Sequence, residues 1–178
     1  YAVSKLANEL YAGVLMQANP SMATIGLRLF NIFGPWQDHQ GGYAAVIPRW
    51  ASACMDGTPP TIFGDGSASR DFCFVGNVSR QIMAIGATED PPSHNVFNIG
   101  TGNGTTLLEL YQTIRQELQA AGVMLTNDGP EHKPWRQGDI VHSLGDINLA
   151  KQELSFDPRD DLRVGIRILL ADQYGLFT

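Results

Sequence analysis

The sequence contains little cysteine, little positive charge and no long hydrophobic run, and each shortage narrows the class of protein. Only two of its 178 residues are cysteines, and Cys54 and Cys73 match neither a zinc-binding spacing nor a disulfide framework. We therefore expect two reduced, buried thiols in a cytosolic protein. The four histidines also show no metal-ligand spacing, so no metal site is predicted.

Charge and hydropathy narrow the partners further. Twelve Lys and Arg residues stand against 18 Asp and Glu residues, which gives a formal net charge of −6, and no basic run is present. Because nucleic-acid surfaces need clustered basic residues to neutralise phosphates, no nucleic-acid partner is expected. No apolar run reaches the roughly 18 residues of a membrane helix, and the start resembles neither a signal nor a transit peptide. We expect a cytoplasmic protein with no membrane partner.

The residues that are present are typical of a globular α/β protein, with 43% hydrophobic and 17% charged residues. Helical periodicity predicts helices over 1–18, 43–55, 76–88, 105–120, 146–154 and 161–174. Short apolar runs predict strands over 23–30, 61–63, 71–75 and 95–99, the first of them buried, with loops over 31–42 and 127–139. No linker divides residues 1–178, so a single unit is expected.

Two features concern the ends of the predicted elements. Thr106 followed by Glu109 predicts a capping box at the start of the helix over 105–120. The glycine-rich segment Gly100 to Gly104 before it has two interpretations, a phosphate cradle or a tight turn. The turn is favoured, because Thr105 replaces the third glycine of a dinucleotide-binding turn and the lysine of a P-loop is missing.

Tyr1 and Lys5 are the first candidate site residues. Residues four apart share one face of a helix, so the phenol and the ammonium can point into one cavity. A nearby ammonium favours the phenolate form, which acts as a base near neutral pH. The alternative is a solvated helix face, on which such a pair occurs by chance.

Five groups of motifs follow in order along the chain. They are Tyr1-x-x-x-Lys5; Arg28 to Pro35; Gly64-Asp65-Gly66 with Ser69 to Phe72 and Asn77-Val78; Asn98-Ile99-Gly100 with Thr106-Leu107; and Arg136-Gln137-Gly138-Asp139. Together they resemble the extended short-chain dehydrogenase/reductase family of NAD-dependent epimerases and dehydratases, in particular UDP-sugar 4-epimerases. The segments 36–38 and 42–50 are most similar to UDP-N-acetylglucosamine 4-epimerases of surface-polysaccharide biosynthesis.

The resemblance implies a fold and a cofactor. The fold is the carboxy-terminal half of such an enzyme, in which late Rossmann strands and helices interleave with a small substrate-binding α/β subdomain. The amino-terminal dinucleotide-binding half is expected to be missing, and the chain, which begins at Tyr1 without a methionine, is expected to start partway through a longer polypeptide. Tyr1 would be the base on the sugar 4-hydroxyl, Lys5 its electrostatic partner, and Phe30 and Ile32 would lie beside the nicotinamide of NAD.

The resemblance also implies a set of residues that bind the UDP-sugar. Arg70 and Arg136 would bind the pyrophosphate, and Gln37 a sugar hydroxyl or N-acetyl group. The other expected contacts are Asn31, Ala45, Val46, Trp50, Thr61, Ile62, Phe63, Asp139 and Ser143, with residues 61–63 holding the uracil edge through backbone groups.

The residues themselves give a physical case for the two arginines. A planar guanidinium suits phosphate oxygens, and Arg70 and Arg136 have Asp71 and Asp139 nearby in the sequence to orient them. The alternative for each is a structural ion pair. Trp135 is assigned to packing.

The apolar stripe of the first helix, Ala2, Leu6, Leu10 and Val14, is expected in the core. The resemblance offers a second interpretation, in which the Tyr1–Ala18 helix packs against a second subunit of a homodimer.

Two hypotheses of different class follow. The first is the carboxy-terminal part of an NAD-dependent UDP-sugar 4-epimerase acting on UDP-N-acetylglucosamine and UDP-N-acetylgalactosamine, with a dehydratase or reductase of the same family as its variant. In it the isolated chain binds little NAD and does not turn over. The second is a non-catalytic module that binds nucleotide sugars or serves assembly.

Overall fold

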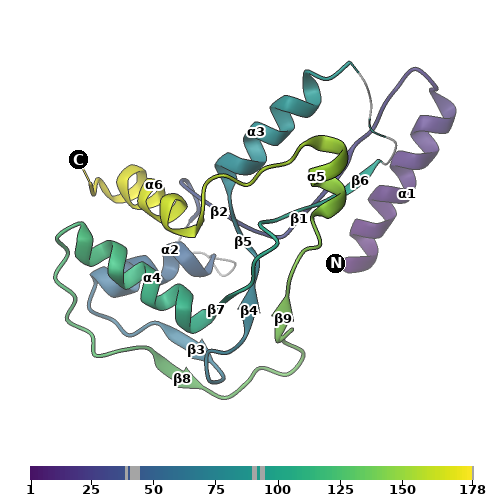
Figure 1. Cartoon of the computed structure of the whole chain (residues 1–178). Coiled ribbons are helices and arrows are strands. Elements are labelled where there is room, and N and C mark those ends of the chain that lie inside the picture. Colours follow the sequence, from purple (N-terminus) through teal and green to yellow (C-terminus); the bar gives the residue numbers. More distant parts are fainter. Residues whose placement is uncertain (39, 41–44, 90–91, 93–94, 178) are drawn as a thin grey trace.

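The computed structural model describes residues 1–38, 40, 45–89, 92 and 95–177, and it confirms a mixed α/β chain (Figure 1). The helices are α1 (Ala2–Ala18), α2 (Val46–Met55), α3 (Val75–Gly86), α4 (Leu107–Ala120), α5 (Asn148–Leu154) and α6 (Leu162–Tyr174). The strands are β1 (Gly26–Leu29), β2 (Asn31–Phe33), β3 (Thr61–Phe63), β4 (Ser69–Arg70), β5 (Phe72–Phe74), β6 (Val96–Ile99), β7 (Thr105–Thr106), β8 (Glu131–Lys133) and β9 (His142–Ser143).

The described strands form three parallel pairs, β1–β6, β2–β5 and β3–β8, and one sheet in the order β7-β4-β9. In the last sheet β4 runs antiparallel to β7 and parallel to β9. Parallel pairs join segments that are far apart in the sequence, because each needs a long crossover connection. Consecutive strands such as β1 and β2 therefore enter different sheets, and Phe30 is the residue at which the chain passes from one to the other.

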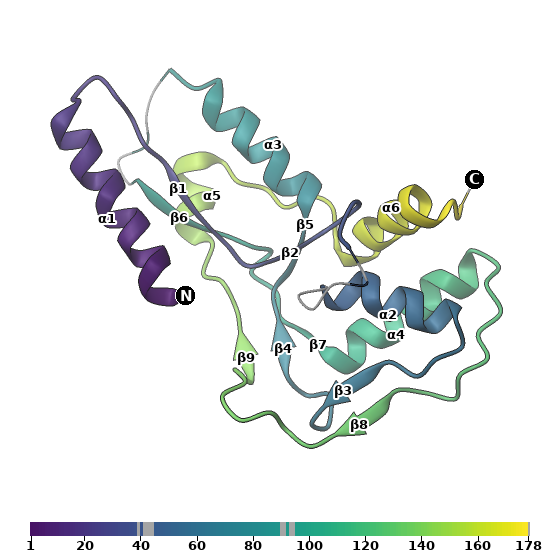
Figure 2. The ribbon, with the colours of Figure 1, turned by 180° about the vertical axis from the view of Figure 1, so that it is seen from behind.

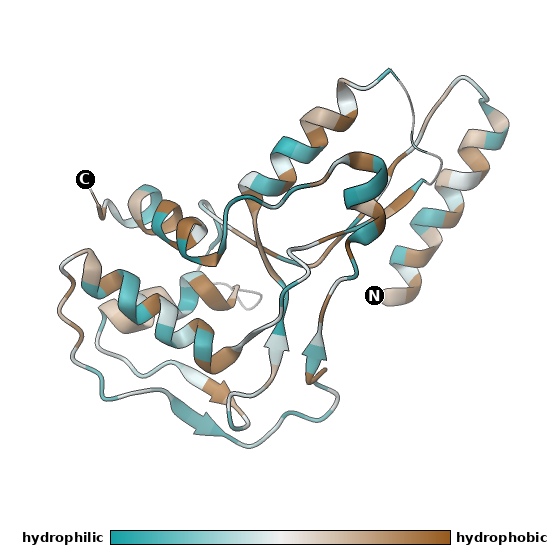
Figure 3. Ribbon diagram, viewed as in Figure 1, coloured by the Kyte–Doolittle hydropathy of each residue, from teal (hydrophilic) through white to brown (hydrophobic). Residues whose placement is uncertain are grey.

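The larger core cluster lies among α2, α4 and α6 and the β2–β5 pair. Its fully buried side chains include Leu110, Ile114 and Leu118, which repeat every four residues along one face of α4. Figure 3 shows the matching pattern of apolar and polar residues along α4 and α6. On the polar side, the buried carboxylate of Glu117 accepts hydrogen bonds from Arg163 and Arg167 of α6, which joins the two helices.

A second cluster surrounds the β1–β6 pair. Phe97 and Ile99 of β6 pack with Ile147, Ala150 and Phe156 from α5 and its flanking segments. Figures 1 and 2 show the β1–β6 pair with α1 beside it at the edge of the molecule.

Helix ends follow the sequence signals closely. Thr106 accepts a hydrogen bond from the N–H of Glu109 (3.1 Å), and the Glu109 carboxylate accepts from the N–H of Thr106 (2.8 Å), so the predicted capping box is confirmed. Asp161 caps α6 through a single hydrogen bond that its carboxylate accepts from the N–H of Val164 (2.9 Å). Such caps depend only on neighbouring residues, which is why the sequence reveals them.

Several expected elements differ in the structure. The predicted loop over 31–42 begins with β2, and the loop over 127–139 contains β8. The strand over 23–30 is shortened to β1 and is not buried, since Arg28 and Leu29 are exposed. Three-residue strands such as β2 and β8 form because a partner strand lies alongside, so no local pattern announces them. Tyr43 and Ala44, at the start of the predicted helix over 43–55, lie outside the described residues.

Helix α1 contradicts the expectation that its apolar stripe lies in the core. None of its residues, all of them described, is buried, and Leu6, Leu10 and Val14 are exposed. Arg28 of β1 donates two hydrogen bonds, of 2.7 and 2.6 Å, to the carboxylate of Glu9, and this ion pair ties α1 to the β1–β6 pair. Among the described residues, no helix combines the length and the apolar character of a membrane span.

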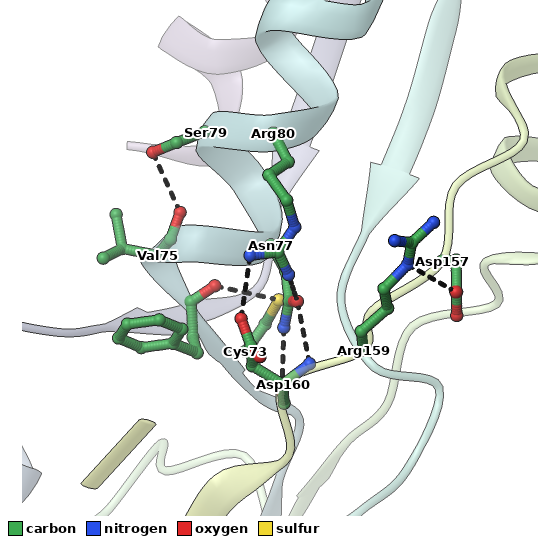
Figure 4. A network of polar contacts seen from close by, with 9 residues as sticks. Cys73, Val75, Asn77, Ser79, Arg80, Asp157, Arg159 and Asp160 are labelled. Carbon is green, nitrogen blue, oxygen red and sulfur yellow. Dashed lines mark hydrogen bonds and ion pairs between the residues drawn. The ribbon is translucent and has the colours of Figure 1, made fainter. Parts of the chain in front are cut away.

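Asn77, which belongs to the third group of motifs, has a structural role. Its amide donates to the carbonyl of Asp160 (2.8 Å) and accepts from the N–H of the same residue (3.1 Å). Arg80, one turn further along α3, forms an ion pair with the Asp160 carboxylate (2.8 Å). Figure 4 shows this network, which fastens α3 to the segment before α6.

Candidate nucleotide-sugar site

A central cavity of about 280 Å³ brings together residues from β2, α2, β3, β4 and the segment after β8. Seven of the residues expected to bind a nucleotide sugar line it: Asn31, Val46, Trp50, Thr61, Phe63, Arg70 and Asp139. Because they come from positions between 31 and 139, only the fold makes them neighbours. The central cavity is therefore the candidate binding site.

Strand alternation decides which side chains of β3 reach the cavity. Thr61 and Phe63 line it, whereas Ile62 between them is fully buried in the larger core cluster. The side chain of Ile62 therefore serves packing, and only its backbone remains available for the expected contact with a uracil edge.

Arg70 reaches the central cavity, but Asp71 does not orient it as expected. The Arg70 guanidinium donates to the carbonyls of Ser69 (2.8 Å) and Val141 (3.1 Å). The fully buried Asp71 carboxylate instead accepts from the N–H of Thr101 (2.7 Å), the Thr101 hydroxyl (2.7 Å) and the N–H of Gly102 (3.0 Å). The expectation was wrong because successive residues of an extended segment point to opposite faces.

The position of Asp71 also resolves the two interpretations of the glycine-rich segment. The N–H groups of Thr101 and Gly102, which a phosphate would need, already bind the carboxylate of the chain itself. A Cβ atom on Gly100 would lie 2.4 Å from that carboxylate, so glycine is required for the close approach. The segment is an internal anchor for Asp71, as the favoured turn interpretation allows.

Asp71 holds two expected substrate-binding segments through its backbone. Its carbonyl accepts from the N–H of Asn31 (3.0 Å), and its N–H donates to the carbonyl of Ser143 (3.0 Å). Its carboxylate also accepts from the N–H of Gly145 (3.4 Å). The rigid junction at Asp71 thus fixes β2 and β9 relative to Arg70.

A side cavity of about 360 Å³ adjoins the central cavity. The two share Arg49, Trp50, Thr61 and Phe63, and the side cavity adds Lys133 and Arg136. The Arg136 guanidinium lies 3.6 Å from the centroid of the Phe63 ring.

Arg136 was expected to be oriented by Asp139, and this expectation is also wrong. The two residues, both in the described part of the chain, form no ion pair, and the N–H of Asp139 donates to the carbonyl of Arg136 (3.3 Å). Stacking on Phe63 orients the Arg136 guanidinium and leaves its N–H groups available for an anion other than Asp139.

Tyr1 and Lys5 lie apart from these cavities, in an α1 cavity of about 510 Å³ between α1 and β1. The Lys5 ammonium is 5.3 Å from the centroid of the Tyr1 ring, so the two share one helix face as predicted. Tyr1 is 94% exposed. The Arg28–Glu9 ion pair lines the same cavity.

Other expected residues lie outside the lining of these cavities. Phe30 packs against Gly145, and Ile32 packs against the second core cluster, so both are engaged within the described chain. The Gln37 amide donates to the carbonyl of Ile32 (3.2 Å) and accepts from the N–H of Gly34 (3.3 Å), which closes the loop after β2. Ala45 is the N-cap residue of α2, and Ser143 pairs with Arg70 in the β4–β9 register.

Six residues that line the central cavity were not predicted as site residues: Arg49, Ala68, Phe72, Leu107, Trp135 and Ile140. Arg49 is three positions after Val46 on α2, a spacing that places both on one helix face and could have identified it. Trp135, assigned to packing, borders the cavity with 45% of its surface exposed. No sequence signal distinguishes such an aromatic residue from a core residue.

Comparisons with known proteins identify the family of the chain. Residues 1–100 match the model of the NAD dependent epimerase/dehydratase family. The UDP-glucose 4-epimerase of Mycolicibacterium smegmatis is 32% identical over 93% of this chain and 50% of its own length. The chain thus spans about half the length of the curated relatives it matches.

Solved structures show the same likeness. The UDP-glucose 4-epimerase of Thermotoga maritima, solved with UDP-glucose, has a TM-score of 0.85 and 30% identity, over 98% of this chain and 53% of that one. The UDP-N-acetylglucosamine 4-epimerase of Methanobrevibacter ruminantium, solved with UDP-N-acetylmuramic acid, has a TM-score of 0.84 and 33% identity, over 98% and 53%. Sequence motifs, fold and comparisons agree: the chain belongs to the NAD dependent epimerase/dehydratase family of extended short-chain dehydrogenases/reductases.

Proposed function

We propose that this chain is the nucleotide-sugar-binding part of an NAD-dependent UDP-sugar 4-epimerase that interconverts UDP-N-acetylglucosamine and UDP-N-acetylgalactosamine. The observation that carries the proposal is that one cavity is lined by Asn31, Arg70 and Asp139 together with Thr61 of β3. In this partly apolar cavity, the arginine suits a phosphate group and the asparagine amide suits hydroxyl groups. The aspartate carboxylate suits a nucleobase. The Methanobrevibacter ruminantium relative supports the choice of an N-acetylated sugar.

The arginines give this site its charge. Arg49 and Arg70 border the central cavity, while Arg136 and Lys133 border the side cavity that adjoins it. In a chain with a formal net charge of −6, this local excess of cations favours an anionic ligand such as a pyrophosphate.

The α1 cavity fits part of the cofactor. A lysine ammonium, which only donates hydrogen bonds, suits the ribose hydroxyls of NAD, and the Lys5 ammonium lies 5.3 Å from the centroid of the Tyr1 ring. When bound, NAD would supply the hydride acceptor for carbon 4 of the sugar. Tyr1 takes the proton of the 4-hydroxyl, and Lys5 stabilises the resulting charge and orients the cofactor.

Binding of UDP to the full chain tests the site. We expect calorimetry to detect UDP binding, and Arg70→Gln to weaken it roughly 10-fold or more, because charge-assisted hydrogen bonds to phosphate contribute about 1.5–3 kcal/mol each. Arg159→Gln is the matched control, since Arg159 forms an exposed ion pair with Asp157 outside the lining of the central cavity. No UDP binding by the unaltered chain would contradict the proposal.

Turnover tests the catalytic assignment. The isolated chain is expected to bind little NAD and to form no product, so we suggest a chimera in which it replaces the matching segment of the Thermotoga maritima enzyme. NMR should then show conversion of UDP-N-acetylglucosamine to its 4-epimer, and Tyr1→Phe should reduce the rate roughly 10²–10⁴-fold. Tyr11→Phe, an exposed tyrosine on the same helix, should leave the rate unchanged.

Two other results would redirect the assignment. A 4-keto-6-deoxy sugar as product would indicate a dehydratase of the same family. UDP binding by the chain together with an inactive chimera would favour the non-catalytic nucleotide-sugar module.

We also propose that α1 is a homodimer surface in the whole enzyme. Leu6, Leu10 and Val14 repeat every four residues on its exposed side, which gives a continuous apolar stripe. Light scattering of the chimera should give a dimer, and Leu10→Glu should give a monomer. A monomer in both cases would refute this surface.

A further inference from the structure

The half-exposed indole of Trp135 is held at the wall of the central cavity by the β3–β8 pair. The carbonyl of Lys133 accepts from the N–H of Gly64 (2.8 Å), and the His132 ring hydrogen-bonds the carbonyl of Gly64 (2.7 Å). These bonds align the segment up to Trp135 with the turn that follows β3. The position of the indole is therefore set by strand pairing.

Gly64 permits an unusually close approach of this ring. Its φ of +83° lies in the left-handed region, and a Cβ atom there would fall 2.3 Å from Cε2 and 2.4 Å from Cζ2 of Trp135. The indole thus lies directly on the backbone of Gly64. Next to it, Arg136 stacks on Phe63. The planar side chains of Trp135 and Arg136 therefore lie against Gly64 and Phe63.

Packing within the described chain does not explain why this large aromatic side chain remains partly exposed. It borders the central cavity together with Arg70, Asp139 and Thr61, and 45% of its surface stays exposed. An anionic group is attracted to the arginines, whereas an uncharged planar ring gains most from covering an aromatic face. The cavity wall therefore offers a separate place for the planar part of the ligand.

We propose that Trp135 is the stacking surface for the nucleobase of the bound nucleotide sugar. This inference rests on the proposed function and deepens it, because it assigns the base to a side chain that the motifs left to packing. The pyrophosphate then extends toward Arg70, and the base covers the indole.

Calorimetry with two probes tests the assignment on the full chain. Trp135→Ala should weaken UDP binding roughly 5- to 100-fold, the range typical of aromatic residues that stack on a base, and Trp135→Phe should retain most of the affinity. Inorganic pyrophosphate has no base, so its affinity should be unchanged in both variants. The melting temperature should also be unchanged, because the indole is half-exposed.

Fluorescence gives an independent readout. Trp36 is 90% exposed and lies outside the lining of the central cavity, so Trp36→Phe removes a background signal and serves as the matched control. UDP should quench the emission of the Trp36→Phe chain. Adding Trp135→Phe should remove most of this quenching, and any quenching that remains is assigned to Trp50, which is buried but also lines the central cavity.

The outcomes separate this inference from the proposed function. If the unaltered chain binds no UDP, both are overturned. If it binds UDP and Trp135→Ala leaves the affinity unchanged, only the stacking role is overturned. Equal losses of UDP and pyrophosphate affinity in Trp135→Ala would indicate a structural role and would also overturn it.

Discussion

One buried carboxylate, that of Asp71, organises much of the central cavity. It joins the glycine-rich segment at Thr101 and Gly102 to the segment at Gly145, while its backbone holds Asn31 and Ser143. A buried acidic group is stable only when it is fully hydrogen-bonded, and here backbone and hydroxyl donors meet that requirement. The residue therefore contributes to the site by positioning its neighbours.

Asp71→Asn should destabilise the chain markedly. The substitution replaces one carboxylate oxygen by an NH2 group, which cannot accept a hydrogen bond from the N–H of Thr101, Gly102 or Gly145. Each buried polar group left without a partner costs about 1–3 kcal/mol. We expect the free energy of unfolding, measured by denaturant titration, to fall by roughly 2–4 kcal/mol.

Asp157→Asn is the control for this prediction. Asp157 forms an exposed ion pair with Arg159, and such pairs contribute about 0–1 kcal/mol. Similar small effects of both substitutions would show that the Asp71 network does not stabilise the fold.

At the level of elements, α4 is stabilised by a cap and by buried side chains, whereas α1 has neither. Helix α4 has a complete capping box and buries Leu110, Ile114 and Leu118. Helix α1 has no side-chain cap and no buried residue, and the Arg28–Glu9 ion pair is its side-chain link to β1. Isolated helices of this length are marginal in water, so we expect α1 to be the less stable of the two helices in this chain.

Hydrogen exchange should reveal this difference. In dilute solution of the isolated chain, the amides of α1 should exchange roughly 100-fold faster or more than those of α4, because local opening of α1 exposes no fully buried residue. Mass spectrometry of the exchanged peptides measures both helices in one sample. Equal protection of α1 and α4 at low concentration would contradict the structural difference described here.

In the whole molecule, the two cysteines report on the integrity of both core clusters. Cys54 belongs to the larger cluster and Cys73 to the second one, and both are buried, as expected from the sequence. Burial raises the pKa of both thiols, and together with the nearby Asp71 carboxylate it raises the pKa of Cys73 to about 11. Neither thiol is therefore in its reactive form near pH 8.

Thiol titration with a disulfide reagent at pH 8 should find both cysteines unreactive in the native chain and both reactive in denaturant. A pH dependence accompanies this protection. Because the folded Cys73 keeps its proton up to a pH of about 11, the unfolded chain loses it first, and the free energy of unfolding should fall as pH rises from about 9 toward 11.

Cys73→Ala isolates this contribution, since the decline above pH 9 should become smaller in that variant. Rapid labelling of native Cys73 at pH 8 would contradict the burial of the second cluster.

Much of the fold could be predicted where it depends on nearby residues. The helices α1, α3, α4 and α6, and the caps at Thr106 and Asp161, follow from periodicity and local hydrogen bonds. The strands β2 and β8 were missed, because three-residue strands exist only through their partners. For the same reason the partners of Arg70 and Arg136 could not be inferred from their acidic neighbours in the sequence.

The sequence by itself determined the family and the kinds of residue at the site, because ordered motifs and the chemistry of arginine, asparagine and aspartate are properties of the chain. Only the tertiary structure decided which of these residues meet. It turned Asp71 toward the glycine-rich segment, stacked Arg136 on Phe63 and left Trp135 at the cavity wall. Parallel strand pairing is the physical reason, since it joins residues far apart in the sequence and selects, by alternation, the face that each side chain occupies.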